Sequence, residues 1–92
     1  MEFEWDPVKE VSNITKHGLS FSDAATVFHD PLAVTYFDPD HSDEEDRFIT
    51  IGTALDGQLV ILSHTDRDEK IRIISARLTT RREKKLYEEG ER

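Results

Sequence analysis

The sequence contains no cysteine, only four glycines and three prolines, and no long run of apolar residues. Without cysteine the chain can form neither a disulfide framework nor a thiolate metal site, and nothing in it points to secretion. No apolar stretch approaches the roughly 18 residues of a membrane-spanning helix, and the residues after Met1 lack the basic start and apolar core of a signal peptide. We therefore expect a cytoplasmic protein, independent of membranes, whose residues 1–92 fold as a single domain.

Positive charge is scarce in the first half of the chain. The net charge is −8, which argues against a protein that coats nucleic acid without regard to sequence. Residues 1–46 hold two lysines against 12 acidic residues, whereas residues 47–92 hold 10 lysines and arginines against 8 acidic residues. An anionic ligand would therefore be bound by the second half.

The N-terminal residues predict a short strand followed by a helix. Residues 3–5 alternate apolar and polar side chains, which is typical of a strand. Asp6 before Pro7 is the pattern of a helix N-cap, and Gly18 suits the left-handed position after a helix end. The apolar residues between these ends recur at helical spacing. We expect them to form a narrow buried stripe of Val8, Val11 and Ile14.

Two more helices are predicted from their end signals. One begins with Ser20 or Ser22 as its cap, runs through Phe28 and is ended by Pro31. Its short link to the first helix predicts an antiparallel pair. The other opens with a capping box, Thr80 to Glu83, and runs to about residue 89. This last helix has few large apolar residues, so it is expected to be loosely held or to dock onto another chain.

The middle of the chain predicts strands at residues 33–37, 47–55, 58–65 and 70–77, because β-branched and aromatic side chains are concentrated there. The acidic residues 38–46 are interpreted as a solvated loop. A calcium loop is the alternative, but the glycine turn and ligand order of an EF-hand are missing.

Turn signals fix an expected register. Asp56-Gly57 predicts a two-residue type I′ turn, which places Leu55 opposite Gln58, Ile51 opposite Leu62 and Ile49 opposite His64. A four-residue loop at 66–69 then pairs Thr65 with Lys70. Arg47, His64 and Arg77 would share one face, and Arg72 would lie on the other. A slip of one residue in the second loop would exchange the faces of Arg72 and Arg77. Both faces are apolar at their centres, so the helix pair is expected on one and the last helix or a partner on the other.

Arginines interrupt the strand at residues 70–77, where the isoleucines would otherwise suggest an ordinary sheet interior. Arginine suits such a strand where its guanidinium emerges on a face that needs fixed positive charge. The alternative is that both arginines extend along an ordinary strand toward water.

Several short motifs together resemble one protein family. They are Trp5-Asp6-Pro7, Lys16-His17-Gly18, Phe21 with Ala24-Ala25, Val27-Phe28-His29-Asp30, Glu45-Asp46-Arg47, Thr65-Asp66-Arg67, Arg72-Ile73-Ile74-Ser75-Ala76-Arg77 and Tyr87. This combination resembles the BrnT toxins, the ribonuclease half of bacterial BrnT/BrnA toxin–antitoxin pairs. The resemblance covers nearly the whole chain, and its departures are the acidic stretch at 38–46 and the net charge of −8.

The resemblance implies a fold and a function. The expected fold is α+β and RelE-like, with two N-terminal helices packed on a mainly antiparallel sheet and a C-terminal helix. The expected function is a metal-independent endoribonuclease toxin, without a cofactor, that cleaves RNA and arrests growth. A BrnA-type antitoxin, a ribbon-helix-helix protein, would neutralise it, and promoter DNA would be bound only through that antitoxin. We also expect a homodimer or a toxin–antitoxin heterotetramer.

Metal-free RNA cleavage needs a group that accepts the 2′-hydroxyl proton, positive charge at the phosphorane and an acid for the leaving oxygen. Histidine can exchange protons near neutral pH, and arginine offers fixed donors that match phosphate oxygens. The candidate catalytic residues are therefore Lys16, His17, Arg47, His64, Arg67 and Arg77, and the candidate RNA-binding residues are Arg72 and Arg81. No two histidines have the helical spacing of metal ligands, so we expect no metal site.

These candidates also have structural interpretations: the helix dipole for Lys16 and His17, the acidic loop for Arg47 and Arg77, packing against Ile49 for His64, a solvated charge for Arg67 and a brace under the sheet for Arg72. The corresponding alternative function is a non-catalytic binding module that acts only in a DNA-binding toxin–antitoxin complex. A third interpretation is an orphan chain without activity.

Overall fold

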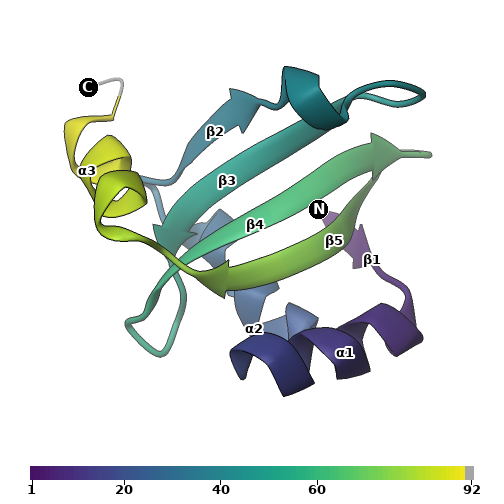
Figure 1. Ribbon diagram of the computed structural model, residues 1–92, viewed down its shortest axis with the longest axis horizontal. Helices are drawn as coiled ribbons and strands as arrows, with labels where there is room; N and C mark the ends of the chain where they lie inside the picture. The colour runs from purple at the N-terminus through teal and green to yellow at the C-terminus, as the bar shows by residue number, and fades with distance from the viewer. Residues whose placement is uncertain (91–92) are drawn as a thin grey trace.

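The computed structural model describes residues 1–90 and consists of one mixed β-sheet with helices against it (Figure 1). In chain order the elements are β1 (Glu2–Glu4), α1 (Pro7–His17), α2 (Phe21–Ala25), a 3₁₀ helix (Thr26–His29), β2 (Val34–Phe37), a 3₁₀ turn (Pro39–His41), β3 (Arg47–Thr53), β4 (Leu59–Arg67), β5 (Lys70–Leu78) and α3 (Arg81–Glu89). The strand order is β1-β5-β4-β3-β2. Only the β1–β5 pair is parallel among these strands. The expected α+β class is confirmed.

Helix α1 begins and ends as predicted, but its buried side is not the predicted one. The Asp6 carboxylate accepts a hydrogen bond from the Val8 N–H, and Gly18 adopts a left-handed φ of 70°. The expected stripe is wrong, because Val8, Val11 and Ile14 are 77%, 65% and 45% exposed.

The buried residue of α1 is Asn13, and its amide explains how the helix is oriented. Strand β1 pairs with β5 only at residues 70–72, so the backbone of Ala76 has no strand neighbour on that edge. The Asn13 side chain accepts from the Ala76 N–H at 3.1 Å and donates to the Ala76 and Leu19 carbonyls at 2.8 and 2.9 Å. Because buried backbone groups require partners, this polar contact, rather than an apolar stripe, fixes the rotation of α1.

The second helix is shorter than predicted. Ser20 caps it through the Asp23 N–H, and the chain changes from α-helix to 3₁₀ helix after Ala25. Its buried side packs on the sheet in a core that contains Leu19, Phe21, Ala24, Ala25, Val27, Ala54, Val60, Leu62, Ile73 and Ala76. We call this side of the sheet the covered face.

The predicted hairpin register is wrong by one residue. Gly57, with φ 90°, donates to the Ala54 carbonyl, so the turn is longer than the two residues expected. Ile51 therefore pairs with Ile61, and Ile49 pairs with Ser63. Because side chains alternate between faces, this shift places His64 on the covered face, opposite to Arg47.

The second turn and a β-bulge bring Arg72 and Arg77 to one face. Asp68 and Glu69, both with positive φ, form a two-residue turn in place of the four-residue loop expected. The pairing then shifts between Ser63 and His64, because Ser63 pairs with Ser75 and His64 with Ile73. The extra residue on β5 reverses the alternation of side chains. Arg72, predicted on the opposite face, thus shares a face with Arg77.

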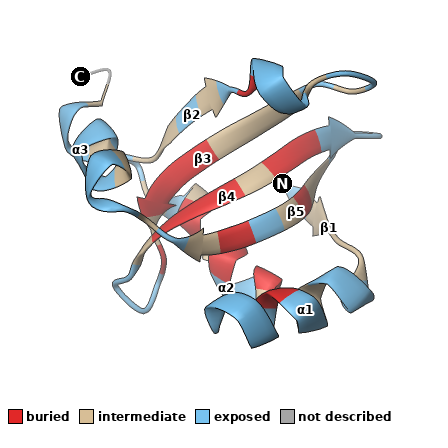
Figure 2. Ribbon diagram, viewed as in Figure 1, coloured by how far each residue is buried: buried red, intermediate tan, exposed pale blue. Residues whose placement is uncertain are grey.

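The side of the sheet that carries Arg47, Arg72 and Arg77 is the open face. Helix α3 packs over one end of it, where the Tyr87 hydroxyl donates to Asp30 at 2.6 Å and lies 3.4 Å from the Thr53 hydroxyl. At the other end of β3 stands the acidic loop (Figure 1). Figure 2 shows that α3 is mostly exposed, as its sequence predicts, whereas the strands beneath are largely buried. Within residues 1–90 no helix combines the length and apolar character needed to cross a membrane.

Candidate active site

The open face is hollowed by a groove of about 230 Å³ between the acidic loop and β5. Its lining consists of Asp38, His41, Arg47, Ile49, Ile61, Leu62, Ser63, Ile74, Ser75 and Arg77. Two predicted catalytic residues, Arg47 and Arg77, therefore lie in one concavity, with serine hydroxyls and isoleucine side chains between them. Apolar walls around two guanidinium groups favour binding of an anion, because charge interactions are stronger away from bulk water.

Arg47 has hydrogen-bonding capacity in reserve. It is the first residue of β3, its side chain is 31% exposed, and its Nη2 lies 3.6 Å from Glu45 Oε1. Its Nε atom is buried and has no hydrogen-bond partner among the described residues. A buried N–H without a partner costs free energy, so a phosphate oxygen that reached it would be bound favourably.

Arg77 is already paired. Its two terminal nitrogens each lie 2.7 Å from a carboxylate oxygen of Glu83 on α3, and Nη1 also donates to the Leu78 carbonyl. The hydrogen bonds to Glu83 raise the pKa of Arg77 against the opposing effect of burial, and those from Arg77 lower the pKa of Glu83 to about 2. Arg77 is thus a fixed cation, but Glu83 occupies two of its donors.

The groove also contains a histidine that the sequence interpretation did not select. The His41 Nδ1 lies 2.8 Å from Asp38 Oδ2, and its ring is 68% exposed, whereas the Asp38 side chain is only 11% exposed. Asp38 is held in turn, because its N–H donates to the Arg47 carbonyl and its carbonyl accepts from the Ser42 hydroxyl. The available signal was Asp38-Pro39-x-His41: proline starts a 3₁₀ turn that brings residues three apart together.

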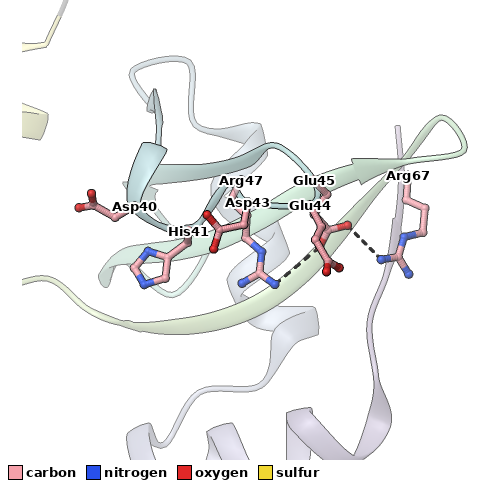
Figure 3. Close-up of a pocket in the computed structure, with 7 residues that line it drawn as sticks. All are labelled: Asp40, His41, Asp43, Glu44, Glu45, Arg47 and Arg67. Carbon is pink, nitrogen blue, oxygen red and sulfur yellow. Dashed lines mark hydrogen bonds and ion pairs between the residues drawn. The ribbon is translucent and has the colours of Figure 1, made fainter.

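A second concavity adjoins the groove at the acidic loop and encloses about 550 Å³ (Figure 3). Glu45 stands between two arginines there, 3.6 Å from Arg47 and 3.1 Å from Arg67. His41 and Arg47 line both concavities. Glu45 therefore holds its carboxylate where a phosphate of a bound polynucleotide would compete for the same cations.

Comparison with known proteins decides the family. Residues 5–83 match the family described as "Ribonuclease toxin, BrnT, of type II toxin-antitoxin system". The chain belongs to the BrnT family. Its fold resembles the 1.1 Å crystal structure of the Brucella abortus ribonuclease toxin BrnT, with a TM-score of 0.63 and 24% identity over 88% of this chain and 99% of that one. A search of curated protein sequences finds no significant match. Family membership implies an antitoxin partner.

The two predicted RNA-binding residues of this BrnT-family chain lie in different places, Arg72 on the open face and Arg81 on α3. Thr65 on β4 pairs with Arg47 on β3 and with Arg72 on β5. The two arginines therefore lie in one row across the sheet. The Arg72 guanidinium lies 3.6 Å from Glu4 on the neighbouring strand, so the predicted bracing contact is also present. Arg81 is exposed at the start of α3, in a basic group with Arg82, Lys84 and Lys85.

Four predicted catalytic residues are not part of the groove. Arg67 lines only the concavity beside it, and the other three lie farther away. Lys16 and His17 are exposed in the last turn of α1, a position where a basic side chain complements the helix dipole. His64 is 4% exposed on the covered face, packed against the rings of Phe28 and Phe48. Burial lowers the pKa of His64, which Asp66 only partly opposes, and its Nε2 lies 2.7 Å from the Thr50 hydroxyl. The shifted hairpin register explains this placement.

Metal-ligating side chains do not cluster in the part of the chain that the structure describes. No three His, Asp or Glu residues among positions 1–90 converge closely enough to hold a metal ion. Among the acidic residues around the second concavity, Glu45 contacts Arg47 and Arg67. The polar side chains that line the groove carry two guanidinium groups, one imidazole, two hydroxyl groups and the carboxylate of Asp38.

Proposed function

We propose that this BrnT-family chain is a metal-independent endoribonuclease and that the groove on the open face is its active site. In this proposal residues 1–92 form one RelE-like toxin domain, of which positions 91–92 lie outside the described residues, and the protein acts on RNA in the cytoplasm. The single observation that carries the proposal is the groove that Arg47 and Arg77 line together, where their two guanidinium groups could bind one phosphate.

The groove supplies the charge that phosphodiester cleavage requires. Attack of the 2′-oxygen on phosphorus concentrates negative charge on the nonbridging oxygens, and preorganised donors around those oxygens lower the barrier. Arg47 would bind one such oxygen through its guanidinium group. Arg77 would bind another after exchanging its contact with Glu83, because guanidinium donors match phosphate and carboxylate equally well.

Cations beyond the groove would position the rest of the RNA strand. Arg67 and Arg72 stand near the acidic-loop end of the face, and Arg81 continues the basic character onto α3. Contacts of this kind set affinity and its salt dependence rather than sequence preference. We propose no part for Lys16, His17 or His64, because the first two lie at the end of α1 and His64 is buried on the covered face.

The antitoxin is proposed to be of the BrnA type, a ribbon-helix-helix protein that binds promoter DNA and neutralises the toxin by covering the groove. Helix α3 is only lightly attached to the sheet, since none of its residues is fully buried, so an antitoxin segment could displace it. A homodimer or a toxin–antitoxin heterotetramer remains the proposed assembly.

A binding module without catalytic activity is the second candidate function. It is favoured by the net charge of −8 and by the carboxylates of Glu45 and Glu83, which occupy Arg67 and Arg77 in the free chain. In that case the chain would act only within the DNA-binding complex with its antitoxin.

Purified protein incubated with a single-stranded RNA in excess EDTA distinguishes the two candidates. The proposal expects fragments that end in a 2′,3′-cyclic phosphate, and their disappearance when the antitoxin is added in equal amount. Cleavage that needs an added divalent cation would overturn metal independence. RNA that stays intact under both conditions, while the toxin–antitoxin complex still binds its promoter, would establish the binding module.

A further inference from the structure

We propose that His41, oriented by Asp38, is the proton-accepting group of the groove. The inference rests on the proposed ribonuclease function and adds a proton acceptor, which the arginines do not provide. Guanidinium groups remain protonated near neutral pH and are poor proton acceptors. A site built from Arg47 and Arg77 alone would stabilise charge but could not remove the proton of the 2′-hydroxyl.

The geometry of the pair fixes which nitrogen of His41 is free. Nδ1 lies 2.8 Å from Asp38 Oδ2, and a carboxylate accepts but does not donate, so Nδ1 carries the proton of this hydrogen bond. In the neutral ring Nε2 is then left with its lone pair. A carboxylate that fixes the tautomer of a catalytic imidazole is a recurring arrangement in enzymes.

The position of the pair is tied to the phosphate-binding residue. Asp38 follows β2 directly, and its N–H donates to the carbonyl of Arg47 at 2.9 Å, so the loop that carries His41 is fastened to the first residue of β3. Ser42 strengthens the same join, because its hydroxyl donates to the Asp38 carbonyl and accepts from the Arg47 N–H. In Figure 3 the His41 ring and the Arg47 guanidinium extend toward the same side of the sheet.

The remaining histidines do not offer this combination. His64 is buried on the covered face, and His17 lies at the end of α1. His29 is exposed on the 3₁₀ helix and lines a shallow hollow with Phe3 and Trp5, away from both arginines. His41 is thus the histidine that shares a concavity with Arg47 and Arg77 among the described residues.

The step balances without an added reactant. The 2′-oxygen bonds to phosphorus and gives its proton to Nε2 of His41, while the bond from phosphorus to the 5′-oxygen breaks. The leaving 5′-oxygen takes a proton from water, and the hydroxide formed is neutralised by the proton that His41 releases. The products are a 2′,3′-cyclic phosphate and a 5′-hydroxyl, so RNA is cleaved and DNA, which lacks the nucleophile, is not.

The test compares the wild-type chain with His41→Ala and with His29→Ala, which removes an exposed imidazole outside the groove. Cleavage of an RNA oligonucleotide is measured with and without added imidazole, and folding is checked by thermal unfolding. We expect His41→Ala to lose about 10²- to 10⁴-fold in kcat with little change in KM. Added imidazole should restore part of the rate, and His29→Ala should match the wild type. Asp38→Asn is expected to reduce kcat as well, because its amide can hold the ring in the wrong tautomer.

The possible failures are distinguishable. If wild-type protein leaves RNA intact, the proposed function falls and this inference falls with it. If wild type cleaves and His41→Ala cleaves at the same rate, only the role of His41 is overturned. A folded His41→Ala that is inactive and gains nothing from imidazole would likewise overturn it, and would show that His41 only shapes the loop.

Discussion

Arg77 and Glu83 form a bidentate ion pair, with both nitrogen-to-oxygen distances at 2.7 Å, that joins the groove on the sheet to helix α3. Glu83 has a second task, since its carboxylate also accepts the Thr80 N–H and completes the capping box of α3. One side chain therefore holds the last helix and occupies a cation of the proposed active site. Release of α3 and exposure of Arg77 are consequently coupled.

Glu83→Gln should destabilise the fold and change its response to acid. The loss of the pair and of part of the cap should cost about 1 kcal/mol, or about 4–8 °C in Tm for a chain of this size. Because Arg77 lowers the folded-state pKa of Glu83 from 4.5 to about 2, its stabilisation is full above pH 4.5 and is lost as the pH falls toward 2. Thermal unfolding between pH 7 and pH 2 measures both effects.

Glu89→Gln is the control. Glu89 is exposed on the same helix, and its replacement removes the same charge. Equal acid sensitivity in Glu83→Gln and Glu89→Gln would show that the pair with Arg77 contributes nothing to stability.

Glu45→Gln should strengthen RNA binding. The Glu45 carboxylate pairs with Arg47 and Arg67, and exposed pairs of this type contribute about 0.2–1 kcal/mol. Its removal should lower the Kd for a single-stranded RNA by about twofold to fivefold, with a steeper dependence on salt. Glu44→Gln is the matched control, because Glu44 is next to Glu45 in the loop and its replacement removes the same charge. If both variants gain affinity equally, net charge rather than competition for the arginines is the cause.

Asn13→Ala should destabilise the chain more than any apolar truncation on the outer side of α1. It leaves the N–H and C=O of Ala76 and the Leu19 C=O without their buried partner. An unsatisfied buried group costs about 1–3 kcal/mol, so we expect a loss of about 2–3 kcal/mol in chemical denaturation. Ser12→Ala, an exposed neighbour, should change stability by less than about 0.5 kcal/mol. Equal small losses would show that α1 is held by other contacts.

His64 should make the fold sensitive to mild acid. Burial lowers its folded-state pKa below the ordinary 6.5, so the unfolded chain binds a proton more readily. The contribution of neutral His64 is complete above pH 6.5 and declines as the pH falls below that value. The free energy of unfolding of wild type should drop as the pH falls below 6.5, and His64→Gln should flatten this part of the profile. A profile unchanged by His64→Gln, with His29→Gln as control, would contradict the assignment.

Local sequence signals predicted much of the fold. The caps at Asp6, Ser20 and Thr80 lie where the sequence places them, because side-chain-to-backbone capping depends only on neighbouring residues. The α+β class and the strands followed from residue type and alternation.

The strand registers, and the sheet face on which each side chain lies, could not be predicted from the sequence, because they depend on turn geometry. The Asp56-Gly57 pair suggested a two-residue turn, but the longer turn shifted β4 by one residue and moved His64 to the covered face. The bulge in β5 brought Arg72 to the face of Arg77 and has no signature in the isoleucine-rich strand. The role of Asn13 could not be predicted for a similar reason, because its buried amide bonds to the edge of a strand that is distant in the sequence.

The candidate site was predicted in part. Arg47 and Arg77 were selected as cations and share one groove. His41 was overlooked, because it stands in an acidic stretch that is typical of a solvated loop, and its contact with Asp38 arises only when the 3₁₀ turn forms.

The most direct test of the account is the single-turnover rate of RNA cleavage by Arg47→Ala, measured beside Lys9→Ala, which removes an exposed cation from α1. Removal of one preorganised donor commonly costs about 10²- to 10³-fold in rate. We expect Arg47→Ala to lose that much at saturating enzyme while its Tm stays close to that of wild type, and Lys9→Ala to cleave normally. If Arg47→Ala cleaves RNA as fast as the wild type, the open face is not the active site.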